Sequence, residues 1–208
     1  MVATTLSARR SSELPVETDP TQRSGRTCDQ DDRLEQTCRS AREGIGGVVP
    51  GRTSDELSGR VALVTGGGRG IGRGISELLA AHGASVAVNY RRDREAADET
   101  VAAIVAAGGI ARAYEGSVDD PDAVAAMVDR VVSDFGFVDI LVCNAGIASR
   151  GRAVADTEPG ELASVIATHA LGPHHLSRCV LPSMRTRGRG DIVMISSVAT
   201  SHMSANGA

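Results

Sequence analysis

The residues most suited to chemistry lie in the glycine-rich segment 65–72, which reads Thr-Gly-Gly-Gly-Arg-Gly-Ile-Gly. Its spacing is Gly66-x-x-x-Gly70-x-Gly72, which differs from the strict G-x-G-x-x-G fingerprint of dinucleotide-binding proteins. The physical basis is the same, because glycines permit a sharp turn and a close approach of the backbone to a pyrophosphate. A helix that follows adds free N–H groups and a positive dipole end. We therefore expect a dinucleotide to bind here, with a purely structural turn as the alternative, at Gly66, Gly68, Arg69, Gly70, Ile71 and Gly72.

A second polar group follows the apolar run 86–88 and reads Asn89-Tyr90-Arg91-Arg92. Proteins that select NAD usually place an acid here to hold the ribose 2′-OH, but no acid occurs before Asp93. Arg91 and Arg69 can instead pair with a 2′-phosphate through charge-assisted hydrogen bonds. The sequence thus favours NADP(H) over NAD(H), with Tyr90 and Arg91 at the site. A solvated basic start of a helix is the alternative.

Small and polar residues follow two later apolar runs. Asn144-Ala145-Gly146 comes after the run 139–142, and Ser196-Ser197 comes after the run 192–195. Side chains of this size can border a nicotinamide ring without blocking access to it.

The elements that must position these residues alternate between strand and helix. Short apolar runs at 61–64, 86–88, 110–114, 139–142 and 192–195 predict strands, the first of them buried on both faces. Such alternation predicts a parallel sheet with right-handed crossovers, whose ligand site lies beyond the carboxyl ends of the strands.

Apolar residues at helical spacing predict the helices between these strands. One begins near Ile71 and is ended by Gly83, and a second covers 97–105. A third covers 124–135 and starts at Asp119 or Asp120, with proline in its first turn. A fourth runs from 162 to about 187, where Pro173 and Pro182 should kink or interrupt it.

Composition excludes several classes of protein. The chain has 208 residues and a net charge of -4, so nothing suggests a nucleic-acid partner. Its 22 basic residues are all arginine, which excludes a Walker phosphate loop and any lysine-based catalysis within the chain. The four cysteines form no C-x-x-C pair, so we expect no metal site and free thiols in a reducing cytoplasm. We also expect no membrane span and no signal peptide.

Residues 1–56 differ from the remainder of the chain. They are rich in Ser, Thr, Arg, Asp, Glu and Gly, and no helical or strand period persists in them. We expect a disordered tail over 1–56 and a single domain over 57–208.

The sequence resembles the short-chain dehydrogenases/reductases. The matching motifs are the segment 65–72, Asn144-Ala145-Gly146 and Ile195-Ser196-Ser197, and the resemblance covers residues 57–208. Within the family, the sequence is most similar to bacterial 3-oxoacyl-[acyl-carrier-protein] reductases. The resemblance implies an α/β fold, a Rossmann-type doubly wound parallel sheet with about five of the family's seven strands. It also implies an NADP-dependent carbonyl reductase or alcohol dehydrogenase that acts on a small carbonyl, alcohol or acyl-thioester substrate, and a possible homo-oligomer.

The resemblance carries roles over to individual residues. Ser197 matches the family's catalytic serine, which orients the substrate oxygen. His169 stands where the family has an asparagine, and there a proton relay competes with a packed core histidine. Ser117, followed by Val118, stands where the family often places an aspartate near the adenine.

The family's Tyr-x-x-x-Lys motif is missing, since Tyr90 and Tyr114 are the only tyrosines and no lysine occurs. We therefore expect a chain that ends before its catalytic helix and does not turn over by itself. A non-catalytic NADP(H)-binding pseudoenzyme or partner subunit is one alternative. A non-functional fragment, with its fifth strand left as an exposed apolar edge, is another.

Overall fold

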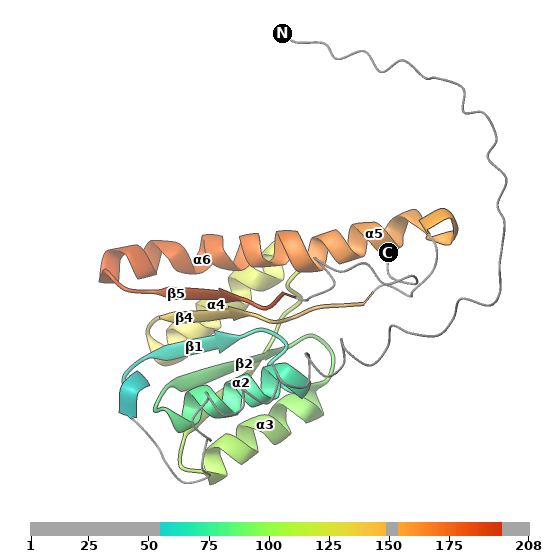
Figure 1. Cartoon of the computed structure of the whole chain (residues 1–208). Helices are drawn as coiled ribbons and strands as arrows, with labels where there is room; N and C mark the ends of the chain where they lie inside the picture. The colour runs from blue at the N-terminus through green and yellow to red at the C-terminus, as the bar shows by residue number, and fades with distance from the viewer. Residues whose placement is uncertain (1–54, 149–153, 197–208) are drawn as a thin grey trace, which may run out of the picture. The chain divides into compact units, whose positions relative to one another are not determined.

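We describe the fold from a computed structural model, which places residues 55–148 and 154–196. Within these ranges five parallel strands form one sheet, in the order β3-β2-β1-β4-β5 (Figure 1). They are β1 (Val61–Val64), β2 (Ser85–Tyr90), β3 (Ile110–Glu115), β4 (Ile140–Cys143) and β5 (Asp191–Met194). Each predicted strand is present: β1 has the predicted bounds, and the ends of the other four differ from prediction by at most two residues.

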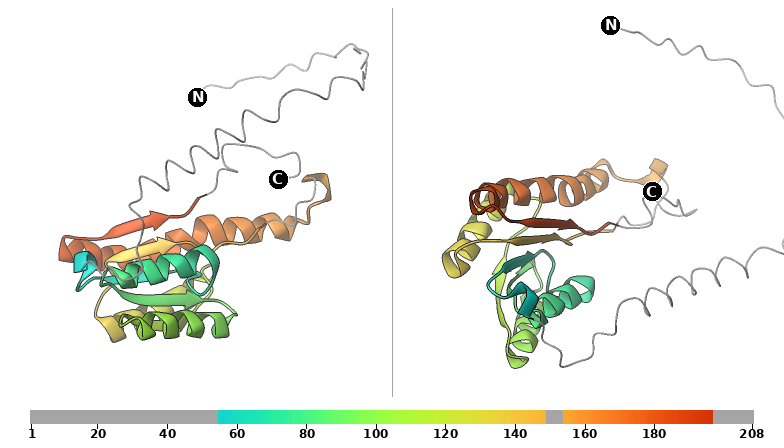
Figure 2. Two further views of the ribbon diagram at one scale, coloured as in Figure 1. Left: turned by 60° about the horizontal axis from the view of Figure 1, so that its bottom comes forward. Right: turned by 60° about the vertical axis from the view of Figure 1, so that its left-hand side comes forward.

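Helices cover both faces of this sheet (Figures 1 and 2). Helices α2 (Gly70–Ala81) and α3 (Arg94–Ala106) pack on one face, and α4 (Pro121–Phe135) and α6 (Gly172–Arg187) pack on the other. The chain leaves β1 toward β2 on one side, and returns to β4 on the other side of β1. This confirms the predicted doubly wound Rossmann-type sheet, and places its topological switch point between β1 and β4.

Two aliphatic clusters fill the space between the sheet and its helices. The alternation of side chains along a strand assigns Leu63 to the cluster beneath α4 and α6, and Val64 to the cluster beneath α2 and α3. All four residues of β1 are buried, as the apolar run predicts for a central strand covered on both faces.

Helix starts follow local capping chemistry. Asp120 precedes α4 and accepts hydrogen bonds from the backbone N–H groups of Asp122 and Ala123, at 2.9 and 3.1 Å. Asp93 precedes α3 and accepts from the N–H of Ala96 at 3.2 Å. By contrast, Arg69 precedes α2 in an extended conformation and provides no side-chain cap. The first turn of α2 therefore keeps its N–H groups for another partner.

The predicted fourth helix has three parts. They are α5 (Pro159–Ile166), a π-helical turn η3 (Ala167–Leu171) and α6. Of the two prolines expected to kink or interrupt this run, Pro173 lies in the first turn of α6, directly after the π-helical turn, and Pro182 lies inside α6 without ending it. A proline is tolerated in a first turn, where its missing N–H has no intrahelical partner.

A buried carboxylate ties the amino ends of the strands together. Asp139, fully buried, accepts from the N–H of Val61 at 3.2 Å. Its Oδ1 lies 3.0 Å from Nε of Arg189 and 3.5 Å from Nε of Arg187. Arg60 donates to the backbone oxygen of Asp139 at 3.2 Å. These contacts connect the starts of β1 and β4 to the segment that enters β5.

The remaining described elements are two 3-10 turns, η1 (Asp55–Leu57) and η2 (Val154–Asp156). Asp55 and Glu56, at the end of the predicted tail, begin η1, and the tail otherwise lies outside the described residues.

β5 pairs only with β4 among the described strands, and Val193 and Met194 are exposed on it. In the part of the chain that the structure describes, no helix has the length and apolarity to cross a membrane.

Candidate functional site

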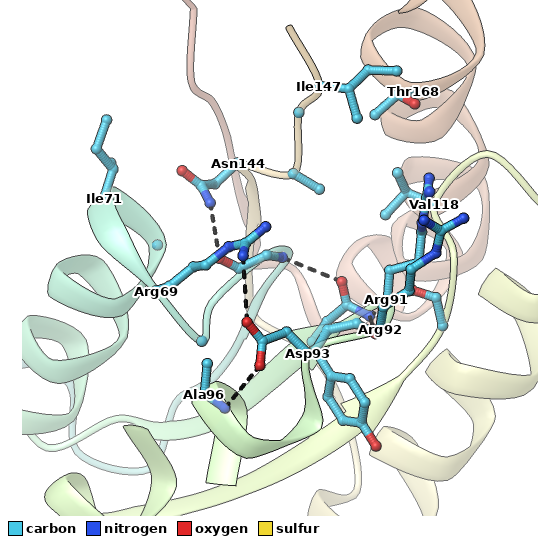
Figure 3. A pocket seen from close by; sticks show the side chains of 18 residues that line it. Arg69, Ile71, Arg91, Arg92, Asp93, Ala96, Val118, Asn144, Ile147 and Thr168 are labelled. Atoms are coloured by element: carbon cyan, nitrogen blue, oxygen red, sulfur yellow. Dashed lines mark hydrogen bonds and ion pairs between the residues drawn. The ribbon is translucent and has the colours of Figure 1, made fainter. Parts of the chain in front are cut away.

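A pocket of about 550 Å³ opens at the carboxyl ends of the strands, on the glycine-rich turn between β1 and α2 (Figure 3). Its wall brings together residues that follow β1, β2, β3 and β4. The predicted site residues that line it are Gly66, Gly68, Arg69, Ile71, Gly72, Tyr90, Arg91, Val118, Asn144, Ala145 and Gly146. Gly70, Ser117 and His169 do not line it, and Ser197 lies outside the described residues.

The glycine turn requires glycine at two kinds of position. Gly66 and Gly70 adopt positive φ angles of 62° and 54°, a conformation that residues with a side chain rarely adopt. Gly72 has no such φ but lies against the turn, since a Cβ on Gly72 would lie 2.1 Å from the backbone oxygen of Gly66. Because position 72 is a glycine, helix α2 can begin directly against the end of β1.

The turn is held on one side by Asn144, from the end of β4. Its Nδ2 donates to the backbone oxygens of Thr65 and Gly66, at 2.9 and 3.2 Å. In return, Oγ1 of Thr65 accepts from the N–H groups of Asn144 and Ala145, both at 3.0 Å. This exchange explains why a small polar sequence follows β4: it fastens the carboxyl ends of β1 and β4 to each other.

Asn89, the buried asparagine of β2, holds the turn on its other side. Oδ1 of Asn89 accepts from the N–H of Gly66 at 3.3 Å, and Nδ2 donates to the oxygen of Gly116 at 2.9 Å. Because Gly116 follows β3, one side chain joins three adjacent strand ends.

Arginines approach the pocket from two directions, Arg69 from the glycine turn, and Arg91 and Arg92 from the end of β2 (Figure 3). Nη1 of Arg69 lies 3.3 Å from Oδ2 of Asp93, and its side chain is 80% exposed. Nη1 of Arg91 lies 3.9 Å from Oδ2 of Asp119. Both guanidinium groups are therefore held by exposed or part-exposed carboxylates, which an incoming anion can replace at low cost.

His169 packs against the loop after β4, which borders the pocket. Its Nε2 lies 3.1 Å from the backbone N and 2.8 Å from the backbone O of Ile147. A Cβ on Gly146 would lie 2.7 Å from Cε1 of His169, so the imidazole lies in close contact with this loop. The interpretation of His169 as a core histidine is wrong, because the residue is exposed. His169 lies in the π-helical turn η3, and its contact is with the loop after β4.

Thr168, next to His169, points the other way and lines the pocket. It is 4% exposed, and its Oγ1 has no hydrogen-bond partner among the described residues. Ser117 does not face the pocket; its hydroxyl bonds instead to the carboxylate of Asp119. The neighbour of Ser117, Val118, is buried and lines the wall near Thr168.

Tyr114 is not placed as a free proton donor. Tyr114 is buried, and its hydroxyl donates to Asp134 on α4 at 2.7 Å. Burial, followed by this hydrogen bond, raises the pKa of Tyr114 far above its usual value. Tyr90 lines the pocket beside Arg91, at the end of β2.

Burial also raises the pKa of the Cys143 thiol to about 11, so that Cys143 is a packing residue rather than a nucleophile.

Three residues that shape the site were not predicted from the sequence: Thr65, Asn89 and Thr168. Asn89 carried a signal, since an asparagine that ends an otherwise apolar central strand must find hydrogen bonds for its amide. Thr65 directly follows a buried strand and precedes the glycines, which is a weaker signal of the same kind. No local pattern marks Thr168.

A model of the family described as short chain dehydrogenase matches residues 60–208. Over 141 residues, 68% of this chain, the sequence is 43% identical to versicolorin reductase from Emericella nidulans. Over 137 residues, 66% of this chain, it is 42% identical to 3-oxoacyl-[acyl-carrier-protein] reductase from Staphylococcus aureus. These matches cover 52% and 55% of the two relatives, so the chain spans about half of their length.

Solved structures agree with the sequence matches. A metagenomic short-chain oxidoreductase in complex with NADP has a TM-score of 0.70 and 38% identity, over 74% of this chain and 69% of that one. An NAD+-bound xylitol dehydrogenase has a TM-score of 0.69 and 34% identity, over 73% of this chain and 58% of that one. The structural relatives thus include proteins with either nicotinamide cofactor.

Proposed function

This chain belongs to the short chain dehydrogenase family, and from that premise we propose that it binds NADP(H) as the cofactor half of a carbonyl-reducing oxidoreductase. The observation that carries the proposal is the pair of guanidinium groups, Arg69 and Arg91, beside the glycine turn. Each of these groups already has an acid beside it: Asp93, which also accepts from the N–H of Ala96, lies beside Arg69, and Asp119 lies beside Arg91. A 2′-phosphate would thus meet positive charge at the place where NAD-selective proteins present a free acid.

The described residues fit such a cofactor. The uncapped first turn of α2 and the glycine turn offer N–H groups to a pyrophosphate. Arg69 and Arg91 would hold the 2′-phosphate, and Asn144, Ala145 and Gly146 would border the nicotinamide. When bound, NADPH supplies a hydride to a substrate carbonyl carbon.

The 208 residues include side chains that fit the cofactor, but they do not include the tyrosine and lysine that supply the proton in the family. The family's Tyr and Lys pair does not occur, because the sequence contains no lysine, and Tyr114 is engaged with Asp134. We expect this chain by itself to bind NADP(H) without turnover. A non-catalytic NADP(H)-binding subunit is a second candidate function, since the buried Tyr114 is engaged with Asp134.

The names of two relatives support a carbonyl substrate. Versicolorin reductase and 3-oxoacyl-[acyl-carrier-protein] reductase are both named as reductases, and the second name specifies a 3-oxoacyl group on a carrier protein, which supports an acyl thioester. The possible homo-oligomer stays a prediction.

Titration of the chain with NADPH and NADH, followed by nicotinamide fluorescence, tests the cofactor. We expect saturable NADPH binding that is at least tenfold tighter than NADH binding. Arg91→Ala should weaken NADPH binding about 10- to 100-fold, since a hydrogen bond to a charged group contributes about 1.5–3 kcal/mol, and should leave NADH nearly unchanged. Arg94→Ala is the matched control, because Arg94 pairs with Asp98 and does not line this pocket. Equal affinity for the two cofactors would exclude selection by the arginines.

A second assay tests catalysis, with NADPH and an acetoacetyl thioester as the substrate. We expect no oxidation of NADPH above the rate without protein. Turnover well above that rate would show that another group donates the proton, and would rule out the non-catalytic subunit.

A further inference from the structure

One polar atom in the pocket wall is left without a partner. Thr168 lies in the π-helical turn η3, is 4% exposed and lines the pocket, yet its Oγ1 makes no hydrogen bond to any described residue. A buried hydroxyl without a hydrogen bond is unfavourable, because it has lost its water and gained nothing in return. Such an atom in a pocket wall is therefore a candidate contact for a ligand.

Several helical hydroxyls among the described residues donate a hydrogen bond to the backbone oxygen four residues earlier. Thr100 donates to Ala96 at 3.0 Å, Ser164 to Gly160 at 2.8 Å, and Thr186 to Pro182 at 3.0 Å. Thr168 does not, and the local π-helical geometry distinguishes it from the other three. π-helical turns are rare and often occur at functional sites, where they reorient a side chain at the cost of regular hydrogen bonding.

The position of Thr168 indicates which part of a dinucleotide it would meet. Figure 3 draws it on the helical wall beside Ile147 of the loop after β4, across the pocket from the glycine turn and Ala96, and on the same side as Val118 and Arg91. Gly172, one turn later, packs directly on Val118, since a Cβ there would lie 3.1 Å from Cγ2 of Val118. The wall that carries Thr168 is thus joined to the residues that follow β3.

We propose that the hydroxyl of Thr168 forms a hydrogen bond with the adenosine half of the bound dinucleotide. The inference rests on the proposed function and names a further binding residue for that site. A threonine hydroxyl can both donate and accept, so either the adenine ring or its ribose provides a suitable partner. Bound ligand then satisfies the hydroxyl that the ligand-free protein leaves unpaired.

The test compares two variants by calorimetric titration with 2′,5′-ADP, which carries the adenosine half alone, and with NADPH. Thr168→Val keeps the shape and removes the hydroxyl, so it should weaken the binding of both ligands by a common factor of about 3 to 10. Thr168→Ser keeps the hydroxyl and should remain within about twofold of wild type. Thr186→Val, on α6 and outside the pocket, should not change either affinity.

Thermal unfolding of the ligand-free chains provides a second readout. Thr168→Val should melt no lower than wild type, because the hydroxyl that it removes has no partner. Loss of affinity without loss of stability separates a ligand contact from a structural one.

The outcomes distinguish the two proposals. A wild-type chain that binds neither ligand overturns the proposed function, and this inference with it. A wild-type chain that binds while Thr168→Val binds equally well overturns only the role of Thr168. Weaker binding of NADPH with unchanged binding of 2′,5′-ADP overturns the assignment to the adenosine half.

Discussion

Gly72 lies so close to Gly66 that a Cβ on Gly72 would lie 2.1 Å from the backbone oxygen of Gly66 and 2.6 Å from Nδ2 of Asn144. The start of α2, the end of β1 and the amide from β4 therefore meet at one point, with room only for a hydrogen. This contact, rather than glycine's φ freedom, makes Gly72 indispensable to the turn.

The first prediction uses this contact and a neighbouring glycine as its control. Gly72→Ala should destabilise the fold by about 1–3 kcal/mol through overpacking, and should weaken NADPH binding because the turn must shift. Gly74→Ala, in the same helix with open space around it, should stabilise the fold by about 0.5–1 kcal/mol. Urea unfolding measures both. Equal stability of the two variants would contradict the close contact.

The second prediction concerns Thr65. Thr65→Val removes the oxygen that accepts from the N–H groups of Asn144 and Ala145, and we expect a loss of about 1–3 kcal/mol from unsatisfied, part-buried donors. Thr65→Ser keeps these bonds and should lose less than half as much. Thermal unfolding, followed by circular dichroism, distinguishes the two. A valine variant as stable as the serine variant would show that this hydroxyl does not fasten β1 to β4.

The third prediction compares two aspartates at the amino ends of the strands. Asp139 is fully buried against Val61, Arg187 and Arg189, so Asp139→Asn should cost about 2–4 kcal/mol in the free energy of unfolding. Asp191 is 60% exposed in its pair with Arg60, so Asp191→Asn should cost less than about 1 kcal/mol. Urea unfolding at low and high salt checks both values. Similar losses in the two variants would mean that burial does not set the strength of these pairs.

The fourth prediction concerns pH. The hydrogen bond from Tyr114, followed by the contact with Arg112 at 3.0 Å, lowers the pKa of Asp134. The stabilisation by Asp134 is therefore fully present above its pKa in the unfolded chain, about 3.9. It is lost as the pH falls through the lower pKa of the folded state. Asp134→Asn should lower the melting temperature at pH 7, and its difference from wild type should shrink below about pH 4.

Tyr114→Phe tests the cause of this pH dependence. The variant keeps the ring and loses the phenol that donates to Asp134, so its melting temperature should fall with acid less steeply than that of wild type. A difference between Asp134→Asn and wild type that stays constant from pH 7 to pH 3 would argue against a lowered pKa of Asp134.

The sequence by itself determined the strands, the helices and the turn that joins β1 to α2. These features depend on neighbours along the chain: the apolar run of β1, the cap by Asp120 and the glycines of 65–72 act within a few residues of one another. The resemblance to the family rests on motifs of the same local kind.

Only the tertiary structure decided which polar atoms form hydrogen bonds with one another and which have no hydrogen-bond partner among the described residues. Asn89 and Asn144 hold the turn from opposite sides because parallel strands bring distant segments together at one edge of the sheet. Within the π-helical turn η3, His169 contacts the loop after β4, whereas its neighbour Thr168 lines the pocket. Helical periodicity cannot predict which of these side chains faces the pocket, because one π-helical turn changes the face on which each following residue lies.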